Sequence, residues 1–258
     1  MVTDPSIDLN SDLGEGYGVW SMGNDAEMLR IVTSANIACG GHAGDADTMF
    51  ATLTQAHANG VTVGAHPGYD DRPGFGRRII PMSLAEIERM VATQIGALLG
   101  AAALAGVPVR YVKAHGALAN LAADDRDVAD AIARATRAVS RDLALLAISG
   151  TELERAGPAA GLPVFSEIFA DRAYLHSGRL VPRSHPDAMI GNADTAAARL
   201  FGFIASGLMP TLDGPSIRLV AQSICVHGDS PGAVDMARKI RAALGQAGIT
   251  LTTFMPPK

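Results

Sequence analysis

Four of the seven histidines in this sequence stand where a hydrophobic run breaks into glycine or proline. They are His42, His66, His115 and His227. Each place is typical of the carboxyl end of a buried parallel strand, and in an α/β barrel those ends converge on the face that carries the chemistry. Imidazole is the side chain best suited to exchange protons near neutral pH. The pattern therefore predicts an enzyme whose active site lies at one end of a barrel.

Polar residues alternate along the first predicted strand. Asp8, Asn10 and Asp12 are two residues apart, so their side chains point to the same side. Inside a barrel such a ladder is costly unless it serves a site. We therefore expect Asp12 to be catalytic, and Asn10 and Glu15 to contact the substrate. In the alternative, Asp12 and Glu15 only cap a turn.

Two imidazoles and a carboxylate come from neighbouring strand ends. Asp12 ends the first strand, and His42 and His66 follow the next two. These three side chains could bind a divalent metal ion and leave coordination positions open for water. They could equally form an acid–base relay without a metal. The spacing fits both, so metal binding stays open at this stage.

Cationic side chains accompany the histidines. Lys113 and His115 alternate at the end of the fourth predicted strand, and a lysine that faces a barrel interior needs a carboxylate or an anion beside it. We expect both to be catalytic. Arg77 lies in a glycine-rich loop, where its planar guanidinium suits a carboxylate or phosphate of the substrate. A solvated turn or a subunit contact is the alternative for Arg77.

The last two strand ends complete the predicted site. Glu167 lies in the sixth predicted strand, and Asp171 and Arg172 follow it. We expect Glu167 and Asp171 to be catalytic and Arg172 to bind substrate; in the alternative, Asp171 and Arg172 form a local ion pair of little consequence. His227 and Asp229, after the last strand, are also expected to bind substrate.

Short apolar runs, many of them β-branched, alternate with helical patterns, as in a parallel sheet covered by helices. Ser83 and Glu86 predict a capping box at the start of one helix. Ser230 and Pro231 predict the start of another. The predicted strands are Ile7–Asn10, Thr33–Cys39, Val61–Ala65, Val109–Ala114, Leu143–Ile148, Val164–Phe169 and Ser216–Val226.

These seven βα units predict a single α/β domain over residues 1–258, a seven-stranded TIM-like (β/α) barrel. The chain length suits that fold, which takes about 250 residues. The loop Arg172–Asn192 is long enough to be functional, as a lid or as a docking surface.

Composition narrows the function classes. A formal net charge of -5 without a basic block argues against a nucleic acid partner. The longest apolar stretch, Ile95–Val109, is shorter than the ~20 residues that span a bilayer, and the first residues lack the features of a signal peptide. Cys39 and Cys225 lie in predicted strands, and buried thiols suit a cytoplasmic protein. Neither a G-x-x-x-x-G-K-S/T loop nor a G-x-G-x-x-G fingerprint is present, so the sequence has no recognisable nucleotide motif.

Seven segments together resemble the LamB/YcsF family, in family order and over nearly the whole chain. They are Asp8–Glu15, Ser34–Asp45, Gly64–Pro67, Gly74–Arg78, Val112–Leu118, Glu167–Tyr174 and Cys225–Asp229. The family usually reads Lys-Pro-His-Gly-Ala-Leu-Tyr-Asn around the fourth strand, whereas this chain has Ala114 for the proline and Ala119 for the tyrosine. Loss of that aromatic ring widens the pocket or alters one contact with the substrate.

The resemblance implies a barrel related to those of sugar deacetylases and glycoside hydrolases. It also implies ATP-dependent hydrolysis of 5-oxoproline (pyroglutamate), a cyclic amide, to L-glutamate in a 5-oxoprolinase complex with two partner subunits, B and C. Because this chain has no phosphate loop, ATP would be handled with the partner subunits. This chain would bind the lactam or its phosphorylated form and promote attack by water.

The resemblance also implies roles for the site residues. Asp12 or His42 would be the base for water, assisted by His66. Lys113 and Arg77 would hold a carboxylate or a phosphate. The two carboxylates of the sixth strand would accept the lactam N–H or orient the histidines.

Two other functions would use the same residues. A stand-alone metal-dependent deacetylase or amidohydrolase of an N-acyl sugar would use Asp12, His42 and His66 as metal ligands. A non-catalytic subunit would capture a small carboxylic acid and report it to a partner. A stoichiometric metal and activity without ATP would favour the first, and partner subunits that are fully active without this chain would favour the second.

Overall fold

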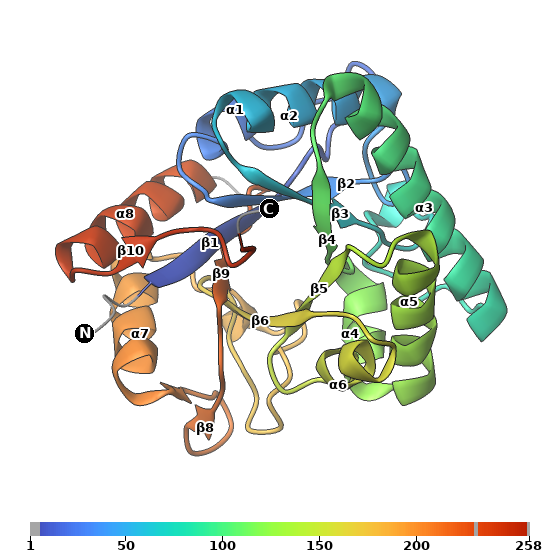
Figure 1. The fold of residues 1–258 in the computed structure, drawn as a ribbon. Coiled ribbons are helices and arrows are strands. Elements are labelled where there is room, and N and C mark those ends of the chain that lie inside the picture. Colours follow the sequence, from blue (N-terminus) through green and yellow to red (C-terminus); the bar gives the residue numbers. More distant parts are fainter. Residues whose placement is uncertain (1–5, 230–231, 257–258) are drawn as a thin grey trace.

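The computed structural model describes residues 6–229 and 232–256. Within these residues seven parallel strands close into a barrel, because the last of them pairs back with the first (Figure 1). In barrel order they are β1 (Ser6–Leu13), β2 (Ser34–Ala38), β3 (Thr62–His66), β4 (Val109–Val112), β5 (Ala144–Ile148), β6 (Val164–Phe169) and β9 (Ser223–Cys225). The predicted seven-stranded α/β barrel is confirmed.

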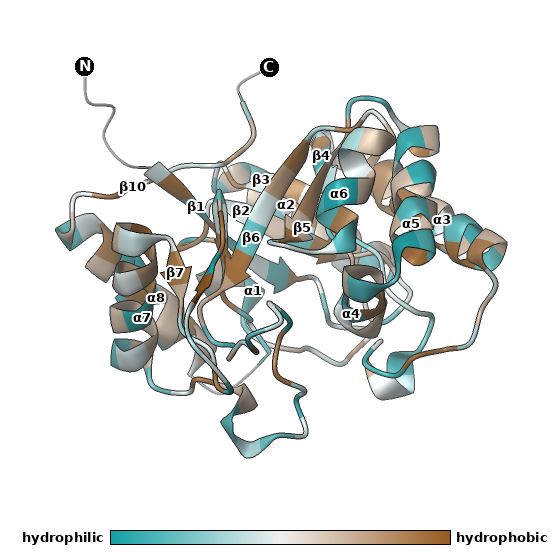
Figure 2. Ribbon diagram, turned by 90° about the horizontal axis from the view of Figure 1, so that it is seen from below, coloured by the Kyte–Doolittle hydropathy of each residue, from teal (hydrophilic) through white to brown (hydrophobic). Residues whose placement is uncertain are grey.

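Helices surround the barrel, and in Figure 2 they carry hydrophilic and hydrophobic residues side by side, as helices with one buried face do. Short 3₁₀ helices cover Arg72–Gly74 and Pro186–Ala188. The α-helices are α1 (Asp25–Met28), α2 (Ala46–Ala58), α3 (Leu84–Ala105), α4 (Gly116–Asp124), α5 (Arg126–Val139), α6 (Glu152–Ala159), α7 (Ala193–Ser206) and α8 (Ala233–Gln246).

The start of α3 has the predicted capping box. The backbone N–H of Glu86 donates to the Ser83 hydroxyl, and the Glu86 carboxylate accepts from the Ser83 backbone. By length and composition α3 is apolar enough to cross a membrane. Its apolar stripe, which includes Ile87, Val91 and Ile95, is buried within this protein.

One predicted strand, Ser216–Val226, is wrong. The structure divides it into β8 (Ile217–Arg218), which pairs antiparallel with β7 (Leu208–Met209), and the barrel strand β9. The chain enters the barrel at Gln222, whose backbone bonds to Ser166 of β6 and Asp8 of β1. An apolar run looks the same whether its ladder partners lie in a hairpin or in a barrel. The predicted helix start at Ser230 and Pro231 lies outside the described residues.

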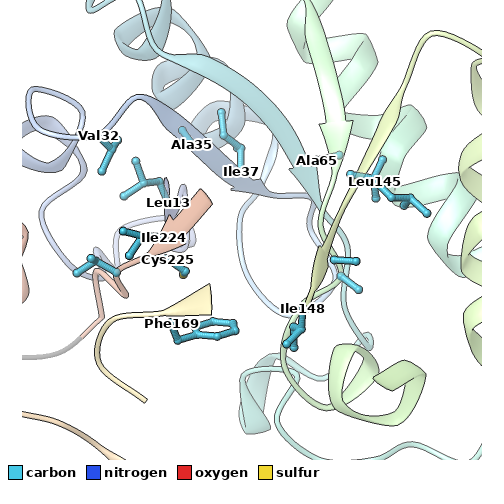
Figure 3. Close-up of a cluster of buried hydrophobic side chains, with 14 of the residues drawn as sticks. Leu13, Val32, Ala35, Ile37, Ala65, Leu145, Ile148, Phe169, Ile224 and Cys225 are labelled. Atoms are coloured by element: carbon cyan, nitrogen blue, oxygen red, sulfur yellow. The ribbon is translucent and has the colours of Figure 1, made fainter. Parts of the chain in front are cut away.

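Apolar side chains pack around the strands. Figure 3 shows some of them, among them Ile37 of β2, Leu145 of β5 and Phe169 of β6. The segment that follows β10 (Thr250–Leu251) covers the amino-terminal end of the barrel. There the Phe254 ring packs edge-on against Tyr111 with centroids 5.0 Å apart, and Met255 is buried in the same cluster. This end is therefore closed, and the opposite end carries the polar residues.

We predict that Gly64→Ala destabilises the barrel. A methyl group on Gly64 would lie 2.2 Å from a carbon of the buried Tyr111 ring. Overpacking of this kind costs ~1–3 kcal/mol in the free energy of unfolding, which urea denaturation would measure. Gly96→Ala is the control: its methyl meets nothing within 4 Å, and alanine should stabilise the interior of α3 by ~0.5–1 kcal/mol. Equal stability of the two variants would contradict this packing.

Candidate functional site

The alternating polar residues of β1 point into the barrel, as the sequence predicts. Asp8 accepts hydrogen bonds from the hydroxyl groups of Thr33 and Ser34, both at 2.6 Å, and from that of Ser223. Asn10 donates to the same Ser223 hydroxyl at 2.6 Å. Burial raises the pKa of Asp8 to about 6 despite these hydroxyl groups. Each polar side chain of this ladder is buried and hydrogen-bonded, and these hydrogen bonds offset the cost of placing polar groups in a barrel core.

Lys113 places an ammonium group in the middle of the barrel. Its side chain is 4% exposed, and Nζ lies 3.0 Å from both Asp12 Oδ1 and Glu167 Oε2. The same nitrogen donates to Asn10 Oδ1 at 3.2 Å and to Cys225 Sγ at 3.2 Å. The carboxylate partner that a buried lysine requires is thus supplied twice, from β1 and from β6.

Burial and charge act differently on these three ionisable groups. Burial alone would raise the pKa of Asp12, but its interactions with His66 and Lys113 hold it well below its usual value. Burial raises the pKa of Glu167, and Lys113 offsets only part of that effect. Burial disfavours the Lys113 ammonium, yet Asp12, Cys225 and Glu167 raise its pKa well above the usual value. At neutral pH the site therefore holds an ionised Asp12 and a charged Lys113. Of the two carboxyl groups, that of Glu167 takes up a proton more readily than that of Asp12.

Glu15, His42, His66 and His115 form a second buried cluster, which we call the His/Glu cluster. One ligand atom from each residue lies within 4.8 Å of all the others. His66 Nε2 is 3.0 Å from His115 Nδ1, and Glu15 Oε1 is 3.3 Å from His42 Nε2. Nitrogen and carboxylate ligands of this kind could hold a divalent metal ion.

The structure groups these residues differently from the predicted ligand set Asp12, His42 and His66. His42 and His66 lie together, but Glu15 and His115 join them. Asp12 touches the cluster through Oδ2, 3.3 Å from His66 Nε2, while its Oδ1 accepts from Lys113 and from Asn36. A second possible group, Asp12, Cys225 and His227, already has the Lys113 ammonium against two of its members.

A pocket of about 320 Å³ opens at the carboxyl ends of the strands. That volume suits a small ligand. It collects residues from six strand ends and from the loop Arg172–Asn192. Ten of the thirteen residues expected at the site line it: Asp12, Glu15, His66, Arg77, Lys113, His115, Glu167, Arg172, His227 and Asp229.

The other three expected residues lie behind the pocket and support residues that line it. Asn10 belongs to the ladder beneath Lys113. Asp171 accepts a hydrogen bond from His227 Nδ1 at 2.7 Å. His42 contacts Glu15. Their placement fits positioning better than direct contact with a ligand.

Three arginines meet at the mouth of the pocket. Arg77 forms an ion pair with Asp229, and Arg183 donates to His227 Nε2 at 3.3 Å. Arg172 donates to the backbone of the same long loop, and burial together with the nearby Arg183 lowers its pKa to about 10. Among the described residues only Arg77 of these three has a carboxylate within ion-pair distance, so the guanidinium groups of Arg172 and Arg183 suit an anionic ligand.

Sequence reasoning missed Arg183. It singled out the loop Arg172–Asn192 by length, and this loop does form one wall of the pocket, but nothing in the sequence selects one arginine within it. The two departures from the family pattern, Ala114 and Ala119, also line the pocket, beside Asn120. Small side chains therefore leave space where the family usually has a proline and a tyrosine.

Comparisons with known proteins agree over nearly the full length. The model of the LamB/YcsF family matches residues 7–258. A protein of Nitrobacter hamburgensis, named as the A subunit of 5-oxoprolinase, is 51% identical over 254 residues, which cover 98% of this chain and 100% of the relative. One of Paracidovorax citrulli with the same name is 53% identical over 249 residues, covering 96% and 99%. The crystal structure of the lactam utilization protein from Thermus thermophilus has a TM-score of 0.90 and 42% identity, covering 96% of this chain and 100% of that one.

We predict that Lys113→Met destabilises the protein in a pH-dependent way. Without the ammonium, Asp12 and Glu167 remain buried without their cation, which costs about 3–5 kcal/mol in the free energy of unfolding. The loss should be largest at pH 8 and smaller at pH 5, because the two carboxyl groups then take up protons more readily. In the wild type the lowered pKa of Asp12 contributes stability above its usual value of 3.8, and this contribution is lost only as the pH falls through the lower folded value.

Urea denaturation at both pH values would measure this. Lys239→Met is the matched control, because Lys239 is exposed and, among the residues that the structure describes, pairs only with the exposed Asp194. That change should alter the free energy of unfolding by less than ~0.5 kcal/mol at either pH. A Lys113→Met variant as stable as the control at pH 8 would contradict the central role of the ammonium.

Proposed function

The chain belongs to the LamB/YcsF family, and we propose that it is the lactam-hydrolysing subunit of an ATP-dependent 5-oxoprolinase, which forms L-glutamate with partner subunits B and C. The names of the relatives at 51% and 53% identity support this assignment. The observation that carries it is that one pocket brings together an ionised carboxylate, a carboxyl group with a raised pKa and a cluster of arginines. Hydrolysis of a lactam that bears a carboxylate needs a base for water, a proton donor for the ring nitrogen and cations for the carboxylate, and these groups can supply them.

The lactam amide resists water, so the reaction needs activation. Phosphorylation of the lactam oxygen makes the ring carbon electrophilic, so that water adds to it and the ring C–N bond breaks, with the nitrogen leaving as the protonated amine. The open-chain acyl phosphate that results then reacts with a second water, which releases phosphate and L-glutamate. Because the sequence has no phosphate loop, we assign ATP to the partner subunits. This chain then receives the lactam or its phosphorylated form. Its free, buried cysteines, Cys39 and Cys225, suit the cytoplasm, where we place the complex.

The arginines at the mouth hold the anionic group of the substrate in this proposal. Arg77, Arg172 and Arg183 can offer paired N–H donors to a carboxylate or phosphate. Lys113, which the sequence suggested for the same task, already contacts Asp12 and Glu167. Its role is to keep Asp12 ionised and in place.

Two carboxyl groups exchange the protons. Asp12, ionised beside Lys113, accepts a proton from the attacking water, and a base positioned in this way contributes ~10²–10⁴-fold in rate. Glu167, whose pKa burial raises, takes up a proton more readily than Asp12 and gives one to the lactam nitrogen as the ring C–N bond breaks. The pair Asp171 and His227 orients Arg183, because His227 donates to Asp171 and accepts from Arg183.

A second candidate is a stand-alone metal-dependent deacetylase or amidohydrolase. The His/Glu cluster is the observation that favours it, since a bound metal would let this pocket act on an N-acyl sugar without ATP. The excess of arginines at the mouth favours an anionic substrate instead, and for that reason we prefer the oxoprolinase.

We predict that glutamate forms from 5-oxoproline and ATP only when this chain is added to its two partner subunits. The measurement is glutamate produced with and without the chain, with Asp12→Asn as the site variant and Asp187→Asn, an exposed residue of the loop Arg172–Asn192, as the control. Asp12→Asn should lower turnover by at least ~100-fold. Equal glutamate production by the partner subunits alone would reject the proposal in favour of a non-catalytic role. Hydrolysis of an N-acyl sugar by the chain alone would reject it in favour of the deacetylase.

A further inference from the structure

We propose that Glu15, His66 and His115 bind a divalent transition-metal ion at the wall of the pocket, with His42 as a positioning residue outside the ligand set. This goes beyond the proposed function, because metal binding can be measured on the full chain without partner subunits, ATP or lactam. It also differs from the ligand set that the sequence suggests, in which Asp12 and His42 are ligands.

The hydrogen bonds of His66 and His115 fix where their lone pairs point. His66 Nδ1 lies 2.8 Å from the backbone oxygen of Lys113, and His115 Nε2 lies 2.8 Å from that of Phe75. A carbonyl oxygen only accepts, so these two ring nitrogens carry the protons. In the neutral rings, His66 Nε2 and His115 Nδ1 are then bare lone pairs, and they face each other at 3.0 Å. Two lone pairs at that distance require a proton or a cation between them.

Glu15 supplies the negative charge that favours a cation there. Its side chain is 5% exposed, and Oε1 lies 3.8 Å from His115 Nδ1. One ligand atom of Glu15 lies within 4.8 Å of one from His66 and one from His115, so a single ion could contact all three residues.

His42 is excluded from the ligand set by the orientation of its ring. The rings of His42 and His115 stack with centroids 3.6 Å apart and planes at 2°. An imidazole lone pair lies in the ring plane, so one ion cannot lie in both of these parallel planes. Glu15, His66 and His115 also line the pocket, whereas His42 does not. His42 Nε2 instead contacts Glu15 Oε1 at 3.3 Å and orients the carboxylate.

Each proposed ligand therefore has an outer partner: the Lys113 carbonyl for His66, the Phe75 carbonyl for His115, and His42 for Glu15. Metal sites in proteins are commonly built in this way. Two imidazoles and one carboxylate suit a first-row ion such as Zn²⁺ or Co²⁺ and leave positions open towards the pocket. Bound there, the ion would polarise a carbonyl or phosphoryl oxygen as a Lewis acid.

The test is metal binding by the full chain after treatment with a chelator. The chain is titrated with Zn²⁺ in a calorimeter, and with Co²⁺ while its visible absorption is recorded. We expect one ion per chain. Glu15→Gln and His115→Gln should abolish saturable binding, and His42→Gln should weaken it by ~10–100-fold, as loss of an outer partner does.

His57→Gln is the matched control, because His57 is an exposed histidine of α2 and should leave binding unchanged. Zn²⁺ should raise the melting temperature of the wild type and of His57→Gln, but not that of Glu15→Gln, which keeps the size of the side chain. Absence of stoichiometric binding in the wild type would overturn the proposal, and so would wild-type affinity in Glu15→Gln. Either result leaves the oxoprolinase assay unaffected, so failure of this proposal and failure of the proposed function can be told apart.

Discussion

The buried ammonium of Lys113 is the interaction on which the rest of the site depends. It follows β4, and it holds the carboxylates of Asp12 from β1 and Glu167 from β6 across the barrel. The backbone oxygen of the same residue fixes the tautomer of His66 at the end of β3. One residue therefore sets the charge of Asp12 and the orientation of a histidine on different walls. A charge buried so deeply is stable only while its partners stay in place, so the chemistry and the closure of the barrel are coupled.

The two clusters divide the site by charge. Around Lys113 a cation lies among carboxylates, whereas the His/Glu cluster groups one carboxyl group with three imidazoles. Asp12 belongs to both, with one oxygen towards Lys113 and the other towards His66. The pKa of Asp12 falls because of its contacts with His66 and Lys113, whereas burial and the nearby Asp12 and Asp229 raise the pKa of Glu15 more than Arg77 lowers it.

Local patterns predicted much of this arrangement. Period-two polarity placed Asp8, Asn10 and Asp12 inside the barrel, and breaks in apolar runs located the strand ends that meet at the pocket. What the sequence could not supply were contacts between loops. Whether Asp12 or Glu15 meets the histidines depends on how the chain turns back after β1. The selection of Arg183 likewise depends on the path of a long loop, which tertiary packing determines rather than local propensity.

The plug formed by Phe254 and Met255 has a consequence for the order of events in the pocket. With Tyr111 it seals the amino-terminal end of the barrel, and the polar ladder above it is fully buried. Within the described residues the pocket is thus a dead end with one entrance. In the proposed reaction, a substrate anchored by the arginines at the mouth would stand between bulk solvent and the groups at the bottom. The attacking water would then have to enter the pocket before the substrate does.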